Sequence, residues 1–103
     1  ANDEAAKFIT GFKEYLKENK QPDIIPAMSA LGYDGYLVAL KAIEKAGSTD
    51  GAAIQAAIKD VTIDGVTGNI TFGANGDAKK NLAFIKTVKD GKITFLTTTT
   101  FEQ

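Results

Sequence analysis

The chain has 103 residues, of which 44% are hydrophobic and 24% charged, a balance typical of globular proteins that argues against disorder over the whole length. Twelve basic residues against 13 acidic ones give a net charge of −1, and they alternate along the chain, so nucleic acid is not an expected partner. Cysteine and histidine are absent, which excludes a disulfide framework, a thiol nucleophile and an imidazole base.

The N-terminal part of the chain predicts an amphipathic helix from Asn2 to Asn19. Its apolar residues recur at helical spacing and form one stripe: Ala5, Phe8, Phe12, Tyr15 and Leu16. Asn2 or Asp3 can cap its first turn, and Pro22 lies where the hydrogen-bond ladder must already have ended.

The middle of the chain predicts a short strand followed by two helices. The β-branched run Ile24–Met28 favours a short edge strand, because Pro26 cannot donate to a ladder. A second helix is expected from Tyr33 to Ala46, with Gly47 as its C-terminal cap. A third helix should follow Asp50, its expected N-cap.

After Asp60 the apolar period changes from helical to alternating, which predicts strands. The expected strand residues are Val66, Asn69–Phe72, Leu82–Val88 and Ile93–Leu96. Asp90-Gly91 is a strong signal for a hairpin turn between the last two. Residues 97–103 are low in complexity, and we expect them to form a loosely ordered tail.

The order of these elements is awkward for an independent domain. An α/β layer normally alternates strand and helix so that every apolar face is covered. Here only one short strand precedes the hairpins, so the alternation looks interrupted, and the chain is expected to be a piece of a larger fold. No stretch is apolar for long enough to cross a bilayer, and no leader begins at Ala1, so we expect any signal peptide to have been removed.

Three blocks of the sequence resemble the C-terminal portion of type I periplasmic solute-binding proteins of the branched-chain amino acid transport family. They occur in the family's order and span nearly the whole chain: Ser29–Asp34 continuing into Leu37–Asp50, Asp64–Phe72 followed by Asn75–Asp77, and Ile85–Ile93. Each block is weak alone, and their combination is fairly specific.

The resemblance implies an α/β fold in which residues 1–103 are a single module, the C-terminal segment of a two-lobed protein. The expected architecture is a partial lobe of three helices followed by short antiparallel strands and a C-terminal hairpin. In this family a small ligand, usually an amino acid, lies between the lobes and is delivered to the membrane permease of an ATP-driven (ABC) transporter. The location would be periplasmic or extracellular, with a lipid anchor in a Gram-positive source.

Three residues are candidates for the ligand site because the resemblance places their segment at the rim of the cleft. Met28 could contact an apolar ligand side chain, the Ser29 hydroxyl could bond a polar group, and Tyr33 could line the cleft. Packing and capping are the alternative roles for all three. For Asp34, stabilisation by the start of the helix is a sufficient explanation.

Neither catalysis nor a metal or cofactor site is supported by any motif. Asp60, Asp64 and Asp77 lie where turns favour aspartate, and Asn75-Gly76-Asp77 lacks the spacing and closing glutamate of a calcium loop. Two alternatives to a transport role stay open. One is the sensing domain of a receptor, and the other is an interaction module in which the isolated fragment forms a homodimer.

Overall fold

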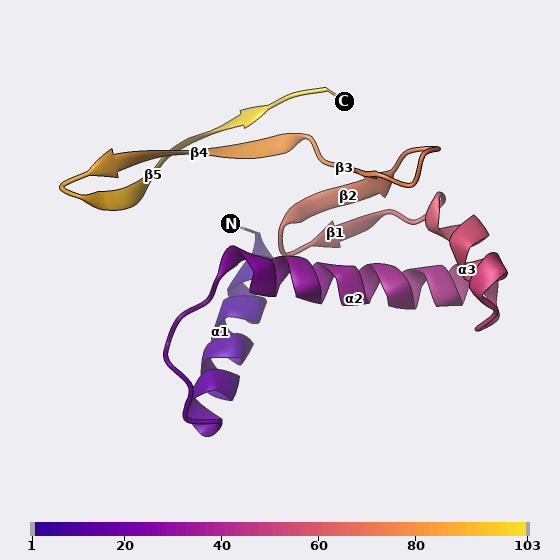
Figure 1. The fold of residues 1–103 in the computed structure, drawn as a ribbon, viewed down its shortest axis with the longest axis horizontal. Coiled ribbons are helices and arrows are strands. Elements are labelled where there is room, and N and C mark those ends of the chain that lie inside the picture. Colours follow the sequence, from indigo (N-terminus) through magenta and orange to yellow (C-terminus); the bar gives the residue numbers. More distant parts are fainter. Residues whose placement is uncertain (1, 103) are drawn as a thin grey trace.

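The computed structural model describes residues 2–102 and consists of three helices followed by five strands (Figure 1). In chain order the elements are α1 (Asp3–Glu18), α2 (Ala27–Ala46), α3 (Gly51–Ile58), β1 (Ile63–Gly65), β2 (Gly68–Phe72), β3 (Ala78–Lys79), β4 (Leu82–Lys89) and β5 (Lys92–Thr100). Close backbone packing joins α2 to α3 and to β1, and it joins the three strands of the β1-β2-β3 sheet. We call these five elements the central unit.

Helix α1 begins and ends as local chemistry requires. The Asn2 side chain caps it by accepting a hydrogen bond from the Ala5 N–H at 2.7 Å. At the other end, Lys20 adopts a left-handed φ of 53°. The N–H of Gln21 then donates to Leu16 O at 2.8 Å, and the N–H of Lys20 donates to Lys17 O at 3.2 Å. This is a Schellman motif, so the helix has already ended before Pro22 is reached.

The strand predicted at Ile24–Met28 is wrong. Residues 24–26 lie outside any helix or strand, and α2 begins at Ala27, six residues before the expected Tyr33. Pro26 explains the difference, because its extended φ of −63° and ψ of 149° suit the position just before a helix. At its other end α2 stops as predicted, with Gly47 in the left-handed conformation at φ 61°.

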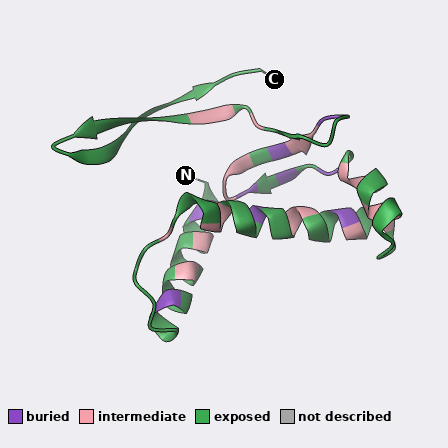
Figure 2. Ribbon diagram, viewed as in Figure 1, coloured by how far each residue is buried: buried purple, intermediate pink, exposed green. Residues whose placement is uncertain are grey.

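A small apolar core lies between α2, α3 and the three-stranded sheet. Its buried members are Ala42, Val61, Ile63 and Ile70, and the half-buried side chains around them are Leu37, Val38, Ile54, Ile58 and Phe72. Asp50 caps α3 as predicted, its carboxylate accepting from the Ala53 N–H at 3.0 Å. The buried positions are few and concentrated in this region (Figure 2).

The strands are antiparallel, and two details differ from expectation. Val66 lies in the turn between β1 and β2, not in a strand. The tail expected from residue 97 is partly ordered, because Thr97 to Thr100 extend β5 and pair with Ile85 to Leu82. Threonine is β-branched and favours strands, which accounts for the extension. Gln103 lies outside the described residues.

The β4–β5 hairpin is the most exposed element of the chain. Its turn is as predicted, with Asp90 and Gly91 at φ 51° and 74°, both left-handed as a type I′ turn requires. Every residue of β5 is exposed, and the hairpin is joined only sparsely to the central unit, beyond which it extends (Figure 1). A two-stranded ribbon of this kind is marginally stable by itself.

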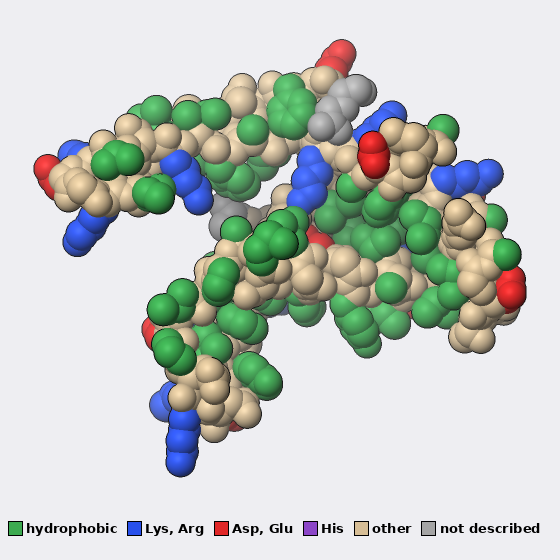
Figure 3. All heavy atoms as spheres, in the orientation of Figure 1, with side chains coloured by type: hydrophobic (Ala, Val, Ile, Leu, Met, Phe, Trp, Pro, Cys, Tyr) green, Lys and Arg blue, Asp and Glu red, His purple; other side chains and the backbone are tan. Residues whose placement is uncertain are grey.

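The chain is less compact than a self-contained domain of its length. Its radius of gyration is 16.3 Å, whereas about 13 Å is expected for a compact domain of this size. Its accessible surface is 7668 Å², whereas a monomer of this mass exposes about 5,600 Å². Exposed hydrophobic side chains contribute to this excess of roughly 2,000 Å², and they gather over α1, α2 and the hairpin (Figure 3).

Candidate functional site

The three residues predicted to face a ligand all lie in the first two turns of α2. Met28 is 72% exposed, Tyr33 is 41% exposed, and Ser29 is half-buried. Met28 was expected at the end of a strand and is instead helical. The N–H of Ser29 donates to Pro26 O at 2.9 Å, which forms the first turn of the helix.

Helix geometry brings two of these three side chains together. Successive residues are rotated by about 100° around an α-helix, so Ser29 and Tyr33, one turn apart, share a face. Met28 is rotated by about 100° from Ser29 and lies on the flank of that face. The start of α2 therefore presents one face with a hydroxyl and an aromatic ring, and the exposed thioether of Met28 lies apart from it.

An aromatic groove adjoins this face, and the sequence did not predict it. The rings of Phe8 and Phe12 stack with centroids 5.4 Å apart, and Phe8 meets Tyr33 of α2 at 5.2 Å. Seven residues line the open groove of about 330 Å³: Glu4, Lys7, Phe8, Gly11, Phe12, Tyr15 and Tyr33. The periodic stripe in α1 predicted buried aromatics, yet Tyr15 is 58% exposed, and only Ala5 and Leu16 of that stripe are buried.

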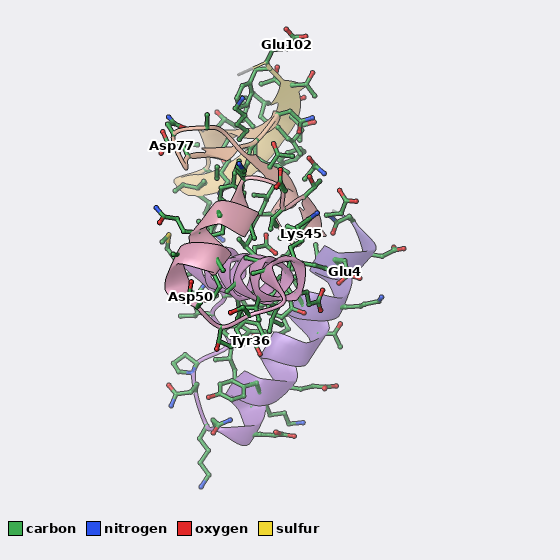
Figure 4. All side chains as sticks on the ribbon, turned by 90° about the vertical axis from the view of Figure 1, so that its right-hand side faces the viewer. Glu4, Tyr36, Lys45, Asp50, Asp77 and Glu102 are labelled. Atoms are coloured by element: carbon green, nitrogen blue, oxygen red, sulfur yellow. The ribbon has the colours of Figure 1, made fainter. Side chains whose placement is uncertain are left out.

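The far side of α2 carries further exposed aromatic surface. Tyr36 is 63% exposed. In Figure 4, which looks along α2, it projects from the side of the helix that faces away from the strands. Leu40, one turn further on, is 41% exposed. Both side chains are therefore open to solvent.

Asp34 has a different role from the one that the sequence indicated. It is the eighth residue of α2, well past the first turn, so the helix dipole does not explain it. It is 1% exposed and accepts hydrogen bonds from the N–H groups of Val66 and Thr67, both at 2.8 Å. The Thr67 hydroxyl donates to the same carboxylate at 2.5 Å. Asp34 therefore anchors the β1–β2 turn to α2.

Two of the other aspartates considered above, Asp64 and Asp77, make local side-chain contacts. Asp64 Oδ1 accepts from Asn69 Nδ2 at 2.8 Å across the β1–β2 pair, and Asp77 Oδ2 accepts from Asn75 Nδ2 at 2.9 Å within its turn. Among residues 2–102 no three acidic side chains gather as metal ligands would. No helix in the same range is long and apolar enough to span a membrane.

Comparison with known proteins agrees with the architecture. The family model described as periplasmic binding protein matches residues 1–92. Among solved structures, the leucine-binding protein LivK from Thermotoga maritima is similar, with 40% sequence identity and a TM-score of 0.74 over 97% of this chain. No match is found among curated proteins.

The extent of the structural match identifies what the chain represents. The alignment covers 27% of the LivK chain, so these residues correspond to about a quarter of that protein. The helices followed by antiparallel strands form part of a lobe of such a protein, as the sequence predicted. The chain belongs to the periplasmic binding protein family.

Proposed function

We propose that this chain is a segment of an extracytoplasmic protein that binds an amino acid and delivers it to the membrane permease of an ABC transporter, without catalysing a reaction. The observation that carries the proposal is the family match over residues 1–92. The similarity to a leucine-binding protein at 40% identity supports a branched-chain amino acid as the ligand.

The exposed surface supports the proposal that these residues complete a larger protein. An excess of roughly 2,000 Å² on one chain is more than the ~800 Å² that one partner buries in a standard protein–protein interface. Apolar faces of this size are normally covered, because each square ångström of apolar surface left in water costs about 25 cal/mol. Both α1 and the β4–β5 hairpin stand away from the central unit, so a second lobe has room to pack against them (Figure 1).

We place the ligand-facing surface of this chain at the start of α2. Met28 supplies an exposed, adaptable apolar side chain suited to an aliphatic ligand, while Ser29 and Tyr33 supply hydroxyl groups on one face. Tyr33 is held by its contact with the Phe8 ring, so its position is restricted before any ligand arrives. The groups that bind the ligand's amino and carboxylate ends are expected to lie mostly outside this chain.

Calorimetry with leucine, isoleucine and valine tests the proposal. The 103-residue chain alone should show no measurable binding, whereas a protein that contains it together with the rest of both lobes should bind. Submicromolar binding by the 103 residues alone would contradict the division of the site, and failure of the complete protein to bind any amino acid would contradict the function.

Two variants of the complete protein test the ligand-facing surface. Met28→Ala should weaken binding of leucine by about 10-fold or more, since losing a buried apolar contact costs 1–3 kcal/mol. Tyr36→Ala is the matched control, because Tyr36 is an exposed residue of the same helix and projects away from the strands (Figure 4). If the two variants bind leucine with equal affinity, Met28 does not contact the ligand.

A self-associating module is a second candidate, favoured by the same excess surface. A stable dimer buries about 1,200–2,000 Å² in total, which the exposed apolar faces of two copies can supply. Sedimentation equilibrium of the 103-residue chain distinguishes the candidates. A tight dimer with cooperative unfolding supports the module, and a monomer at all concentrations contradicts it.

A further inference from the structure

Three side chains form a continuous hydrogen-bonded chain from α2 to the start of the hairpin. Asp34 of α2 accepts from the Thr67 hydroxyl in the β1–β2 turn at 2.5 Å. The Thr67 hydroxyl oxygen in turn accepts from the Lys80 ammonium at 2.6 Å. The three residues are 13 to 46 positions apart in sequence, so only the folded structure brings them together.

The chemistry of this chain gives it a direction. A threonine hydroxyl has one proton, and here it is donated to the carboxylate, which leaves the oxygen lone pairs for the ammonium. Hydrogen bonds with an ionised donor or acceptor are roughly twice as strong as neutral ones. Asp34 is buried, so the positive charge of Lys80 also offsets a carboxylate that is shielded from water.

Lys80 lies in the short connector between the central unit and the β4–β5 hairpin. Strand β3 ends at Lys79 and β4 begins at Leu82, so Lys80 and Asn81 form the connector between the central unit and the hairpin. Beyond the connector, the hairpin is joined only sparsely to the central unit. The hydrogen bond from the Phe101 N–H to Asn81 O at 3.1 Å ties the end of the hairpin back to the same connector.

We propose that the Asp34–Thr67–Lys80 chain sets the direction in which the β4–β5 hairpin leaves the central unit. With Lys80 held at Thr67, the connector has one orientation relative to α2. Without this contact the hairpin swings about residues 80–81. Ser29 and Tyr33 lie on the same helix as Asp34, so the contact also fixes the hairpin relative to that end of α2.

Spin-label distance measurements on the 103-residue chain, without ligand, test this inference. Lys45→Cys near the end of α2 and Lys89→Cys at the hairpin provide two exposed label sites in a sequence without cysteine. Lys80→Met and Thr67→Val should each broaden the distance distribution. Lys79→Met, which removes the neighbouring exposed lysine, and Thr67→Ser, which keeps the hydroxyl, should leave it narrow.

The double variant separates the Thr67–Lys80 contact from any other contact of Lys80. If the two residues act through one hydrogen bond, Lys80→Met should add no broadening to Thr67→Val. Additive broadening in the double variant would overturn the inference. So would a distance distribution of Lys80→Met as narrow as that of Lys79→Met. Should Thr67→Val fail to fold by circular dichroism, Lys80→Arg, which keeps a cationic donor, must stay narrower than Lys80→Met. Because no ligand is involved, the outcome is independent of the proposed amino acid binding.

Discussion

Replacing Gly65 by alanine tests the contact between α2 and the β1–β2 turn. A Cβ at position 65 would lie 2.5 Å from Asp34 Oδ1 and 2.7 Å from Oδ2, where ordinary contacts begin at 3.4 Å. The carboxylate would have to retreat by 3.4 − 2.5 = 0.9 Å. It cannot do so freely, since it is buried and accepts three hydrogen bonds.

The cost follows from the hydrogen bonds that the retreat would break. Each bond to a charged acceptor contributes about 1.5–3 kcal/mol, and a shift of this size takes one or two of them beyond hydrogen-bonding range. We therefore expect Gly65→Ala to lower the free energy of unfolding by about 3 kcal/mol.

Urea unfolding of the 103-residue chain measures this loss: the urea concentration at the midpoint should fall, while the dependence of the unfolding free energy on urea stays unchanged. Gly35→Ala is the matched control: Gly35 adjoins Asp34 in α2, and a Cβ there meets nothing within 4 Å. It should raise stability by about 0.5–1 kcal/mol, because alanine is the better helix former. In an Asp34→Ala background the Gly65→Ala loss should shrink below about 0.5 kcal/mol. A Gly65→Ala midpoint equal to that of Gly35→Ala, or an undiminished loss in that background, would refute the reasoning.

Two further predictions concern the ends of α1. Lys20→Gly should raise stability by about 0.5–1 kcal/mol, since φ of 53° strains a residue with a side chain. Thermal unfolding checks the sign by comparison with Lys17→Gly, which puts glycine at a helical position in the last turn of α1 and should lower stability. Asn2→Ala should cost about 1 kcal/mol through loss of the N-cap, and somewhat more because Asn2 Nδ2 also donates to Gly65 O at 3.0 Å. Asn2→Ser retains a capping oxygen, so a loss as large as that of Asn2→Ala would contradict the capping argument.

Features determined by neighbouring residues could be predicted from the sequence. The caps at Asn2 and Asp50 and the turn at Asp90-Gly91 each depend on contacts within a few positions. The start of α2 could not, because an Ile-Ile-Pro run is compatible with a strand edge and with the lead-in to a helix. In the structure the run is the lead-in, with Pro26 as the residue just before the first turn of α2.

The candidate site was less predictable than the fold. The partners of Asp34 lie 32 and 33 residues away, so no local pattern could reveal that it anchors a turn. The aromatic groove was missed for another reason: an apolar stripe at helical spacing predicts burial, but it cannot show whether a covering element exists. Met28, Ser29 and Tyr33 stay predictions, placed together at one end of α2 and awaiting a ligand measurement.

The exposed β5 strand has a consequence for how the protein is made. From Ile93 to Phe101 the sequence contains no charged residue, no proline and no glycine, and its side chains are β-branched or aromatic with a single leucine. Such a segment is a template for strand addition by another chain whenever it is uncovered. β5 stays open to such pairing during folding until another part of the protein covers it. Conditions that slow the folding of the rest of the protein should therefore produce aggregates that begin at β5.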